Sequence, residues 1–357
     1  MGDILHALPA VTALRQAHPE WVIDWVVEPR WQPLLAAEGS TGRGPARPVV
    51  DCFHLAPTKE WRRAPLSLKT IREIKALRSA LRAGGYDAVL DLQGAIRSAA
   101  AGRLAGCPRL IGEAEPRERI ARWIFTERVA TRGAHVIEQD VELASAVAGD
   151  AFAPVAPWLP VEAAAEGWAD EVLPPSARQP GSRRTRGDGT GLGPGDGSQA
   201  VLISPGAGWG AKRWPAERYA AVAKSLADRG LRVLVNAGPG EEPLADAIVE
   251  GSGGAATSLT CSLAQLIALT RRIALCIGGD TGPLHLACAL GRPVVGIYGP
   301  TDPSRNGPFG TRFRVLRSPD SRRDHSRRAA PEAGLLTIQP EDVLRAADEL
   351  LAEETAP

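Results

Sequence analysis

The sequence predicts an α/β protein made of two doubly wound domains with parallel sheets. Three observations lead to this fold class. Short apolar runs typical of buried strands alternate with amphipathic helical segments, which is the pattern of βα units. At 357 residues the chain is longer than one typical core supports. A stretch rich in Gly, Pro, Ser and charge, residues 174–198, divides the α/β pattern into two similar halves.

The first half opens on a helix, because apolar residues recur at helical spacing from Asp3 to Ala17 and Asp3 stands where an N-cap would. Further elements are expected as a strand at 22–27, a helix at 68–81, a strand at 88–90 and helices at 117–126 and 136–147. A doubly wound domain normally begins with a central strand. We therefore expect about ten further residues, one strand and a turn, upstream of Met1.

The second half continues the alternation. Its expected elements are strands at 201–203, 232–235, 273–277 and 294–297, and helices at 216–229, 263–270, 284–290 and 340–351. We divide the chain into an N-terminal domain (1–173), a flexible linker (174–198), a C-terminal domain (199–335) and a C-terminal segment (336–357). A basic stretch at 317–328 precedes the last helix, which we expect to pack back on the N-terminal domain.

Composition excludes several classes of protein. The net charge of +1 provides no global field for nucleic acid. The five cysteines show no CxxC spacing, which favours free thiols in a reducing cytosol over disulfides or zinc. His135 and Glu138 lie three apart on one helix without a third ligand, so the sequence predicts no metal site and no cofactor. No apolar run approaches the ~18 residues of a membrane span, and no signal peptide opens the chain. We expect a cytoplasmic protein.

The segment from Cys276 to Gly310 carries the clearest sign of a ligand site. A strand runs into Asp280-Thr281-Gly282-Pro283, an apolar helix follows, and a second strand ends in Gly299-Pro300. Both turns fall at the carboxyl ends of parallel strands, where open α/β sheets bind ligands. A helix that begins here offers N–H groups to a phosphate. A purely structural strand-turn-helix would look similar, but the polar cluster that includes His285 favours a ligand site.

Several motifs occur in a familiar order along the chain. They are Met1-Gly2-Asp3-Ile4-Leu5-His6-Ala7-Leu8-Pro9, Asp24-Trp25-Val26-Val27-Glu28, Asp91-Leu92-Gln93-Gly94 with Arg97-Ser98, Lys212-Arg213-Trp214-Pro215, and the Asp280–Pro303 block. Together they resemble glycosyltransferase family 9, the lipopolysaccharide heptosyltransferases, over most of the chain except the linker. The resemblance implies a GT-B fold: two Rossmann-like domains facing a cleft, with the acceptor mainly on the first and the nucleotide-sugar on the second. The implied reaction moves L-glycero-D-manno-heptose from ADP-heptose to a Kdo sugar of the inner core, with inversion.

The resemblance also implies a donor site. Lys212 would be a point charge on the diphosphate, the alternative being a solvated turn lysine. The N–H groups of Thr281, Gly282 and Leu284 would cradle the diphosphate, and Pro283 fits the first helical turn because its missing N–H costs little there. Three further residues have open alternatives: Asp280 (heptose hydroxyl or helix cap), His285 (phosphate or heptose donor, or packed helix residue) and Glu241 (ADP ribose or exposed helix start).

On the acceptor side, Asp3 matches the family's catalytic base, with a plain N-cap as the alternative. A carboxylate at a helix N-terminus is held ionised and is a weak base unless other groups offset this. The acceptor, Kdo-lipid A at the inner leaflet, is anionic, and arginine forks match carboxylates and phosphates. The expected acceptor residues are Arg62 and Arg63 beside Lys59 and Trp61, extended by Gln93, Arg97 and Arg117. We expect Trp61 to lie against lipid or sugar.

The expected partners are therefore ADP-heptose and Kdo-lipid A, with peripheral membrane contact, no nucleic acid and a monomeric state. Other readings stay open at this point. A second family 9 heptosyltransferase type would use a type II-like acceptor, and a nucleotide-sugar epimerase would need acids and bases that are not apparent. If Met1 is the true start, the protein would be a truncated, non-catalytic binder of nucleotide or glycolipid. An NAD-dependent oxidoreductase is disfavoured because no GxGxxG follows an early strand.

Overall fold

The computed structural model describes residues 1–174, 200–321 and 330–355, and the chain divides into two compact units. Unit 1 is Met1–Val161 and unit 2 is Glu162–Pro357. The linker expected at 174–198 lies outside the described residues except for its first residue, and so does the larger part of the basic stretch at 317–328. Within the described ranges, no helix is both long and apolar enough to span a bilayer.

Unit 2 is a doubly wound sheet of six parallel strands. The strands are β6 (Ala200–Ser204), β7 (Arg232–Asn236), β8 (Ala256–Leu259), β9 (Leu275–Gly279), β10 (Val294–Tyr298) and β11 (Phe313–Arg317). Their order is β11-β10-β9-β6-β7-β8, which is 6-5-4-1-2-3 when counted from β6 and therefore the order of the Rossmann fold. The order reverses between β6 and β9, and such a switch point is where ligands of these sheets bind.

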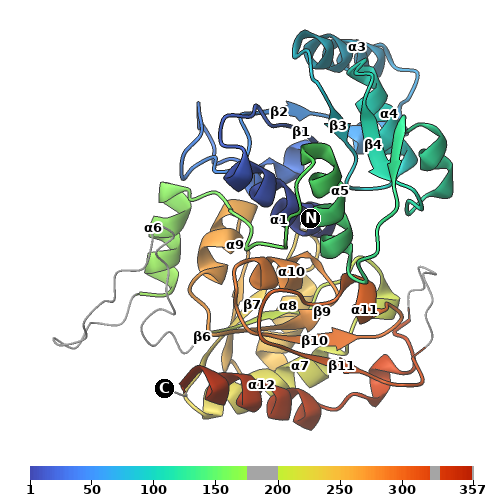
Figure 1. The fold of residues 1–357 in the computed structure, drawn as a ribbon. Coiled ribbons are helices and arrows are strands. Elements are labelled where there is room, and N and C mark those ends of the chain that lie inside the picture. The colour runs from blue at the N-terminus through green and yellow to red at the C-terminus, as the bar shows by residue number, and fades with distance from the viewer. Residues whose placement is uncertain (175–199, 322–329, 356–357) are drawn as a thin grey trace. The chain divides into compact units, whose positions relative to one another are not determined.

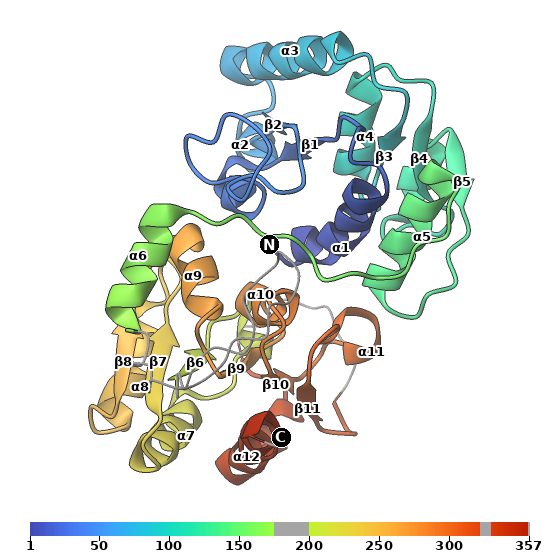
Figure 2. The ribbon, with the colours of Figure 1, turned by 60° about the vertical axis from the view of Figure 1, so that its left-hand side comes forward.

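Helices cover both faces of this sheet, which is why β6, β9 and β10 are buried along their whole length. Figures 1 and 2 show α7 (Ala216–Asp228) and α12 (Pro340–Thr355) on one face, and α9 (Leu263–Thr270) and α10 (Gly282–Ala289) on the other. Two helices extend these layers, α8 (Glu242–Gly251) beside α7 and α6 (Ala163–Val172) against α9. Shorter elements are η3 (Gly210–Lys212), α11 (Pro303–Asn306) and η4 (Leu335–Thr337).

The last helix is not where the sequence led us to expect it. We expected the helix of the C-terminal segment (336–357) to pack back on the N-terminal domain, but α12 packs against α7, β10 and β11 of unit 2. Its apolar stripe explains this placement, since Val343, Ala347 and Leu350 are buried in the same core as Leu226. The turn before the helix is also fixed there, because Trp214 Nε1 donates to the Ile338 carbonyl at 3.1 Å.

The domain boundary also differs from the expected division at residue 173. Helix α6 belongs to unit 2, because Glu166 is ion-paired with Arg271 and Arg272 at the end of α9. Asp170 adds a second contact, 2.7 Å from Arg272 Nη2. The side chain of Arg271 is only 7% exposed, and a buried guanidinium needs a carboxylate partner. These ion pairs hold α6 on unit 2.

Unit 1 contains two small parallel sheets. One is β1 (Asp24–Val27) with β2 (Cys52–Leu55), and the other is β3 (Val89–Leu90), β4 (Leu110–Glu113) and β5 (Glu127–Val129). Its helices are α1 (Gly2–Ala17), α2 (Thr58–Arg63), α3 (Leu68–Ala83), α4 (Ile96–Leu104) and α5 (Val136–Ala148), with η1 at Pro29–Leu34. The orders β2-β1 and β3-β4-β5 repeat β8-β7 and β9-β10-β11 of unit 2. Among the described residues, unit 1 has no strand in the place of β6, which in unit 2 joins β7 to β9, so its strands form two separate sheets.

The prediction of a helix at 117–126 is wrong. A short 3-10 turn, η2 (Arg119–Trp123), stands there and leads into β5. Thr126 explains the early end of this turn, because its backbone N–H donates to the Leu110 carbonyl at 2.9 Å and its hydroxyl accepts from Leu110 N at 2.7 Å. These bonds draw the chain into the sheet beside β4.

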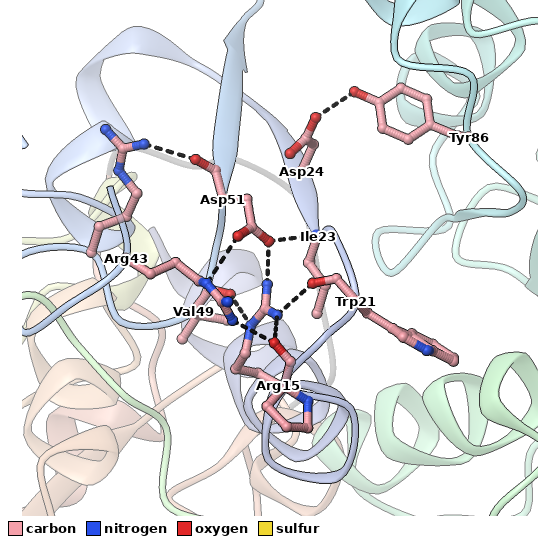
Figure 3. A network of polar contacts seen from close by, with 10 residues as sticks. Arg15, Trp21, Ile23, Asp24, Arg43, Val49, Asp51 and Tyr86 are labelled. Carbon is pink, nitrogen blue, oxygen red and sulfur yellow. Dashed lines mark hydrogen bonds and ion pairs between the residues drawn. The ribbon is translucent and has the colours of Figure 1, made fainter. Parts of the chain in front are cut away.

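A buried arginine joins α1 to the start of β1 (Figure 3). Arg15, whose side chain is 3% exposed, donates to the carbonyls of Val49 at 2.9 Å and Trp21 at 2.6 Å and pairs with Asp51. Asp51 also accepts from Ile23 N at 2.8 Å. Since these carbonyls would otherwise be buried without donors, Arg15 holds the entry to β1 in place.

Candidate functional site

A pocket opens at the switch point of the unit 2 sheet. Its walls come from the ends of β6 and β7, the loops that follow them, and the start of α10. The lining residues are Ser204, Gly206, Ala207, Gly208, Asn236, Glu241, Thr281 and Pro283. The pocket therefore lies where Rossmann topology predicts a ligand.

Beside this pocket, Asp280 is held between two basic side chains. Lys212 Nζ pairs with Asp280 Oδ2, and His285 Nε2 lies 3.0 Å from Oδ1. All three side chains are nearly buried, at 11%, 12% and 6% exposure for Asp280, Lys212 and His285. Burial by itself raises the pKa of Asp280, but the hydrogen bond and charge of His285 and the charge of Lys212 outweigh it and hold the pKa well below its usual range. Asp280 is therefore ionised, and His285 Nε2 carries the shared proton.

This arrangement excludes two of the structural alternatives that the sequence left open. Lys212 is not a solvated turn lysine, because it is nearly buried and its ammonium also lies 4.6 Å from the centre of the Trp209 ring. Asp280 does not cap α10, whose N-cap is Thr281. The three side chains instead form one charged cluster at the carboxyl end of β9.

The first turn of α10 is open toward an anion. Thr281 makes no side-chain cap, and Pro283 occupies one of the first two helical positions. The first N–H groups of a helix have no partner within it, so those of Gly282 and Leu284 are available to a ligand together with the positive end of the helix dipole. His285 N is already bonded to the Thr281 carbonyl, at 3.3 Å. The expected phosphate cradle therefore consists of few groups and depends on Lys212 for most of its charge.

Glu241 lines the pocket directly over the loop that follows β6. Its Oε2 accepts from Gly238 N at 3.1 Å, which fixes the carboxylate at the start of α8. The carboxylate lies so close to Gly206 that a Cβ at that position would be 2.0 Å from Oε2. A side chain at position 206 would therefore displace the Glu241 carboxylate, which is the far end of a flexible side chain, from this position.

In unit 1, the predicted residues around Asp3 come together at the start of α1. Gln93 Nε2 donates to Asp3 Oδ2 at 2.6 Å, and Arg117 Nη1 lies 3.5 Å from the same oxygen. Arg97 Nε in turn donates to Gln93 Oε1 at 3.4 Å. The Asp3 side chain is 49% exposed, so both contacts leave Oδ1 accessible. Asp3 is not simply a cap, since the N-cap of α1 is Met1.

A tight loop after β3 places Gln93 beside Asp3. Asp91 Oδ1 accepts from the N–H groups of Gln93 at 2.8 Å and Gly94 at 2.9 Å, and Ser98 donates to Oδ2 at 2.8 Å. Gly94 adopts φ +61°, and a Cβ there would be 3.0 Å from the backbone nitrogen of Arg117. The close approach that Gly94 permits brings Arg117 to Asp3.

The other predicted acceptor residues are not joined to this cluster by any described contact. Arg62 and Arg63 end α2, the helix that follows β2, and both are exposed. Trp61, which we expected to lie against lipid or sugar, is partly buried. It packs against Leu77 and Leu81, and its Nε1 donates to Glu73 at 2.8 Å, so it joins α2 to α3.

Sequence reasoning missed two polar side chains of the pocket, Ser204 and Asn236. Each is the polar last residue of a strand and follows three apolar residues, and that signal was present in the sequence. Ser204 Oγ is buried and has no hydrogen-bond partner among the described residues, as is also true of the Tyr298 and Thr301 hydroxyls near the end of β10. Such unsatisfied groups are costly unless a ligand or water completes them.

Comparison with known proteins identifies relatives of the chain in both sequence and fold. The family model for glycosyltransferase family 9 (heptosyltransferase) matches residues 74–335. Lipopolysaccharide heptosyltransferase 1 of Escherichia coli K12 is 31% identical over 323 residues, which are 89% of this chain and 91% of that protein. E. coli heptosyltransferase WaaC with ADP superposes with a TM-score of 0.75 at 26% identity, covering 98% and 97% of the two chains. WaaC with ADP-2-deoxy-2-fluoro heptose gives 0.73 at 27%, covering 98% and 96%. The expected α/β fold of the GT-B type is confirmed.

Proposed function

Because the chain belongs to glycosyltransferase family 9, the heptosyltransferases, we propose that it transfers L-glycero-D-manno-heptose from ADP-heptose to a Kdo sugar of the lipopolysaccharide inner core. The observation that carries this proposal is the unit 2 pocket at a Rossmann switch point, which is lined by a carboxylate and a helix N-terminus and has the pair of Lys212 and Asp280 beside it. These groups suit the three parts of a nucleotide-diphosphate-sugar. The similarity to a type 1 enzyme across almost the whole chain favours Kdo as the acceptor over a type II-like acceptor.

In this proposal, unit 2 binds the donor. Glu241 accepts hydrogen bonds from the ribose hydroxyls, while Lys212 and the first N–H groups of α10 stabilise the diphosphate. Asp280 accepts from heptose hydroxyls, because it is ionised and each of its oxygens keeps a lone pair beyond its bond to Lys212 or His285. Lys212 thus neutralises charge on both the protein and the leaving group.

Unit 1 activates the acceptor. As a Kdo hydroxyl oxygen attacks the anomeric carbon, its proton passes to Asp3 Oδ1, and the carbon–oxygen bond to the β-phosphate breaks with its electron pair leaving on ADP. Attack opposite to the leaving group inverts the anomeric configuration. Gln93 and Arg117 are positioning residues, because both contact Oδ2 and so fix the direction of Oδ1.

We further propose that the enzyme works as a monomer at the cytoplasmic face of the inner membrane, in peripheral contact with the lipid. Support comes from the junction of α2 and α3, where Arg62 and Arg63 stand beside two exposed leucines, Leu66 at 88% and Leu68 at 80% exposure. Cations next to apolar side chains suit an anionic glycolipid surface.

The proposal is tested by ADP release from ADP-heptose with Kdo₂-lipid A as acceptor. Wild-type protein should turn over, and Asp3→Asn should lower kcat by roughly 10²- to 10⁴-fold while ADP affinity stays the same. The matched control is Asp87→Asn, an exposed carboxylate of the same unit, which should behave as wild type. A wild-type protein without turnover would defeat the proposal, and loss of ADP binding in Asp3→Asn would make Asp3 structural.

Acceptor binding has its own test. The double variant Arg62→Ala/Arg63→Ala should raise KM for Kdo₂-lipid A without changing KM for ADP-heptose, whereas Arg78→Ala, an exposed arginine on α3, should change neither. Turnover only with an acceptor that already carries heptose would show that the Kdo assignment is wrong.

A further inference from the structure

Three side chains with metal-binding chemistry lie together on the first sheet of unit 1, away from the residues that the proposed reaction uses. They are Asp24, Cys52 and His54, and one ligand atom of each lies within 4.8 Å of the others. Asp24 and Cys52 are paired in register at the starts of β1 and β2. His54 is two residues beyond Cys52, so both point to the same face of the sheet.

Asp24 has an acceptor that the protein does not satisfy. Its Oδ2 accepts from the Tyr86 hydroxyl at 2.7 Å, as Figure 3 shows, but Oδ1 is buried and has no partner among the described residues. The Asp24 side chain is 13% exposed. A carboxylate oxygen buried without a donor is expensive, so a group that binds Oδ1 would stabilise this site.

Tyr86 also orients His54. The Tyr86 hydroxyl lies 2.8 Å from His54 Nε2, and His54 Nε2 is 3.6 Å from Asp24 Oδ2. Because the Tyr86 proton is donated to Asp24, its oxygen accepts from the imidazole. A hydroxyl that fixes both a carboxylate and an imidazole is the kind of outer contact that supports metal ligands in proteins.

We propose that Asp24, Cys52 and His54 form a binding site for one divalent cation of the zinc class. One sulfur, one nitrogen and one oxygen ligand are typical of zinc, whereas calcium and magnesium prefer oxygen alone. The carboxylate and the thiolate together bring two negative charges, which match a divalent ion. Binding releases the Cys52 thiol proton to solvent. Cys52 is exposed, and the ion would replace the weak contact of its Sγ with the Phe53 carbonyl at 3.8 Å, while water can take the fourth position.

The effect of such an ion would be local to unit 1. β1 and β2 pair only with each other among the described strands, and the ion would bridge their first residues, Asp24 and Cys52. It would therefore resist fraying of this two-stranded sheet, which is too small to be stable by itself. Heptose transfer does not require the site, since none of its residues belongs to the proposed donor or acceptor groups.

The test uses the full chain and zinc or cobalt as the probe. We expect one zinc per chain after dialysis, a zinc-induced rise in melting temperature, and thiolate-to-cobalt charge-transfer absorption with cobalt. Cys52→Ser should lose all three, and Cys261→Ser, the partly exposed thiol of unit 2, should keep them. Tyr86→Phe should keep the site but weaken zinc affinity roughly 10- to 100-fold.

A far-UV circular dichroism spectrum and a zinc-free melting temperature that equal those of the wild type show that Cys52→Ser is folded. Zinc binding by this variant that equals the wild type would overturn the proposal, and so would the absence of zinc binding from the wild-type protein.

Discussion

Substitution of Gly206 by alanine should weaken ADP binding by displacing Glu241. The new Cβ would lie 2.0 Å from Glu241 Oε2 and 2.3 Å from its Cδ, distances that real Cβ contacts do not show. The carboxylate therefore has to move by about an ångström or more, away from the position in which we propose that it binds the ribose. A hydrogen bond to a charged group contributes about 1.5–3 kcal/mol, so loss of one such bond predicts a Kd for ADP roughly 10- to 150-fold higher.

The assay is calorimetric titration with ADP, and the loop supplies its own control. Gly208 lines the same pocket, but a Cβ there meets nothing within 4 Å, so Gly208→Ala should bind ADP nearly as well as the wild type. Glu241→Ala should lose affinity to the same degree as Gly206→Ala. In the Glu241→Ala background the Gly206 substitution should cost nothing more, because the group it displaces is gone.

Two results would refute this reasoning. Wild-type affinity in Gly206→Ala would show that the carboxylate is not needed where it stands. Additive losses in the double variant would show that the alanine acts on the loop itself rather than through Glu241.

Three further outcomes follow from the charged groups. Lys212→Met should lower unfolding free energy by about 3 kcal/mol in urea denaturation, because Asp280 would stay buried with one partner fewer, whereas exposed Lys224→Met should change it by less than about 0.5 kcal/mol. Arg15→Met should lower the unfolding free energy by about 3 kcal/mol in the same assay, because the acceptors of Arg15 would lose their donor. ADP affinity should not change, since all of these acceptors belong to unit 1. The folded-state pKa of Asp91 is raised above its ordinary 3.8, so its stabilising contribution is complete below that value and is lost as pH rises through the folded pKa. Asp91→Asn should therefore gain melting temperature relative to the wild type between pH 3 and 7, and a difference that is flat or falls with pH would contradict this.

Long, strongly periodic segments were predictable from the sequence. The helix expected at 263–270 is α9, and that at 216–229 is α7, because each carries a continuous apolar stripe and clear boundary residues. The failures have a different physical basis. Residues 117–126 were expected to form a helix, but the hydrogen bonds of a single residue, Thr126, with Leu110 draw the chain into β5 of the sheet. Local pattern does not report such non-local bonds.

The candidate site was predictable in position and less so in its contacts. Strand ends and glycine turns located Asp280, Lys212 and Glu241, since parallel topology alone gathers such ends on one edge. The pairing of Lys212 with Asp280 joins residues 68 positions apart, and no periodicity contains it. The same holds for Asp24 and His54, which sequence reasoning passed over because the cysteines looked dispersed.

The repeated strand order explains how one fold produces two different carboxylates. β3 and β9 hold the same place in their units, and each is followed at once by an aspartate, Asp91 and Asp280. Burial alone would raise the pKa of both carboxyl groups. Asp91 meets backbone N–H groups and a hydroxyl, which are neutral and do not overcome burial, so its pKa stays raised. Asp280 meets Lys212 and His285, and its pKa falls. With neutral donors, Asp91 organises the loop that carries Gln93. With cationic partners, Asp280 stays ionised, and an ionised carboxylate is suited to binding a polyol. Topology fixes where the carboxylate stands, and a few side chains supplied by neighbouring loops decide its chemistry.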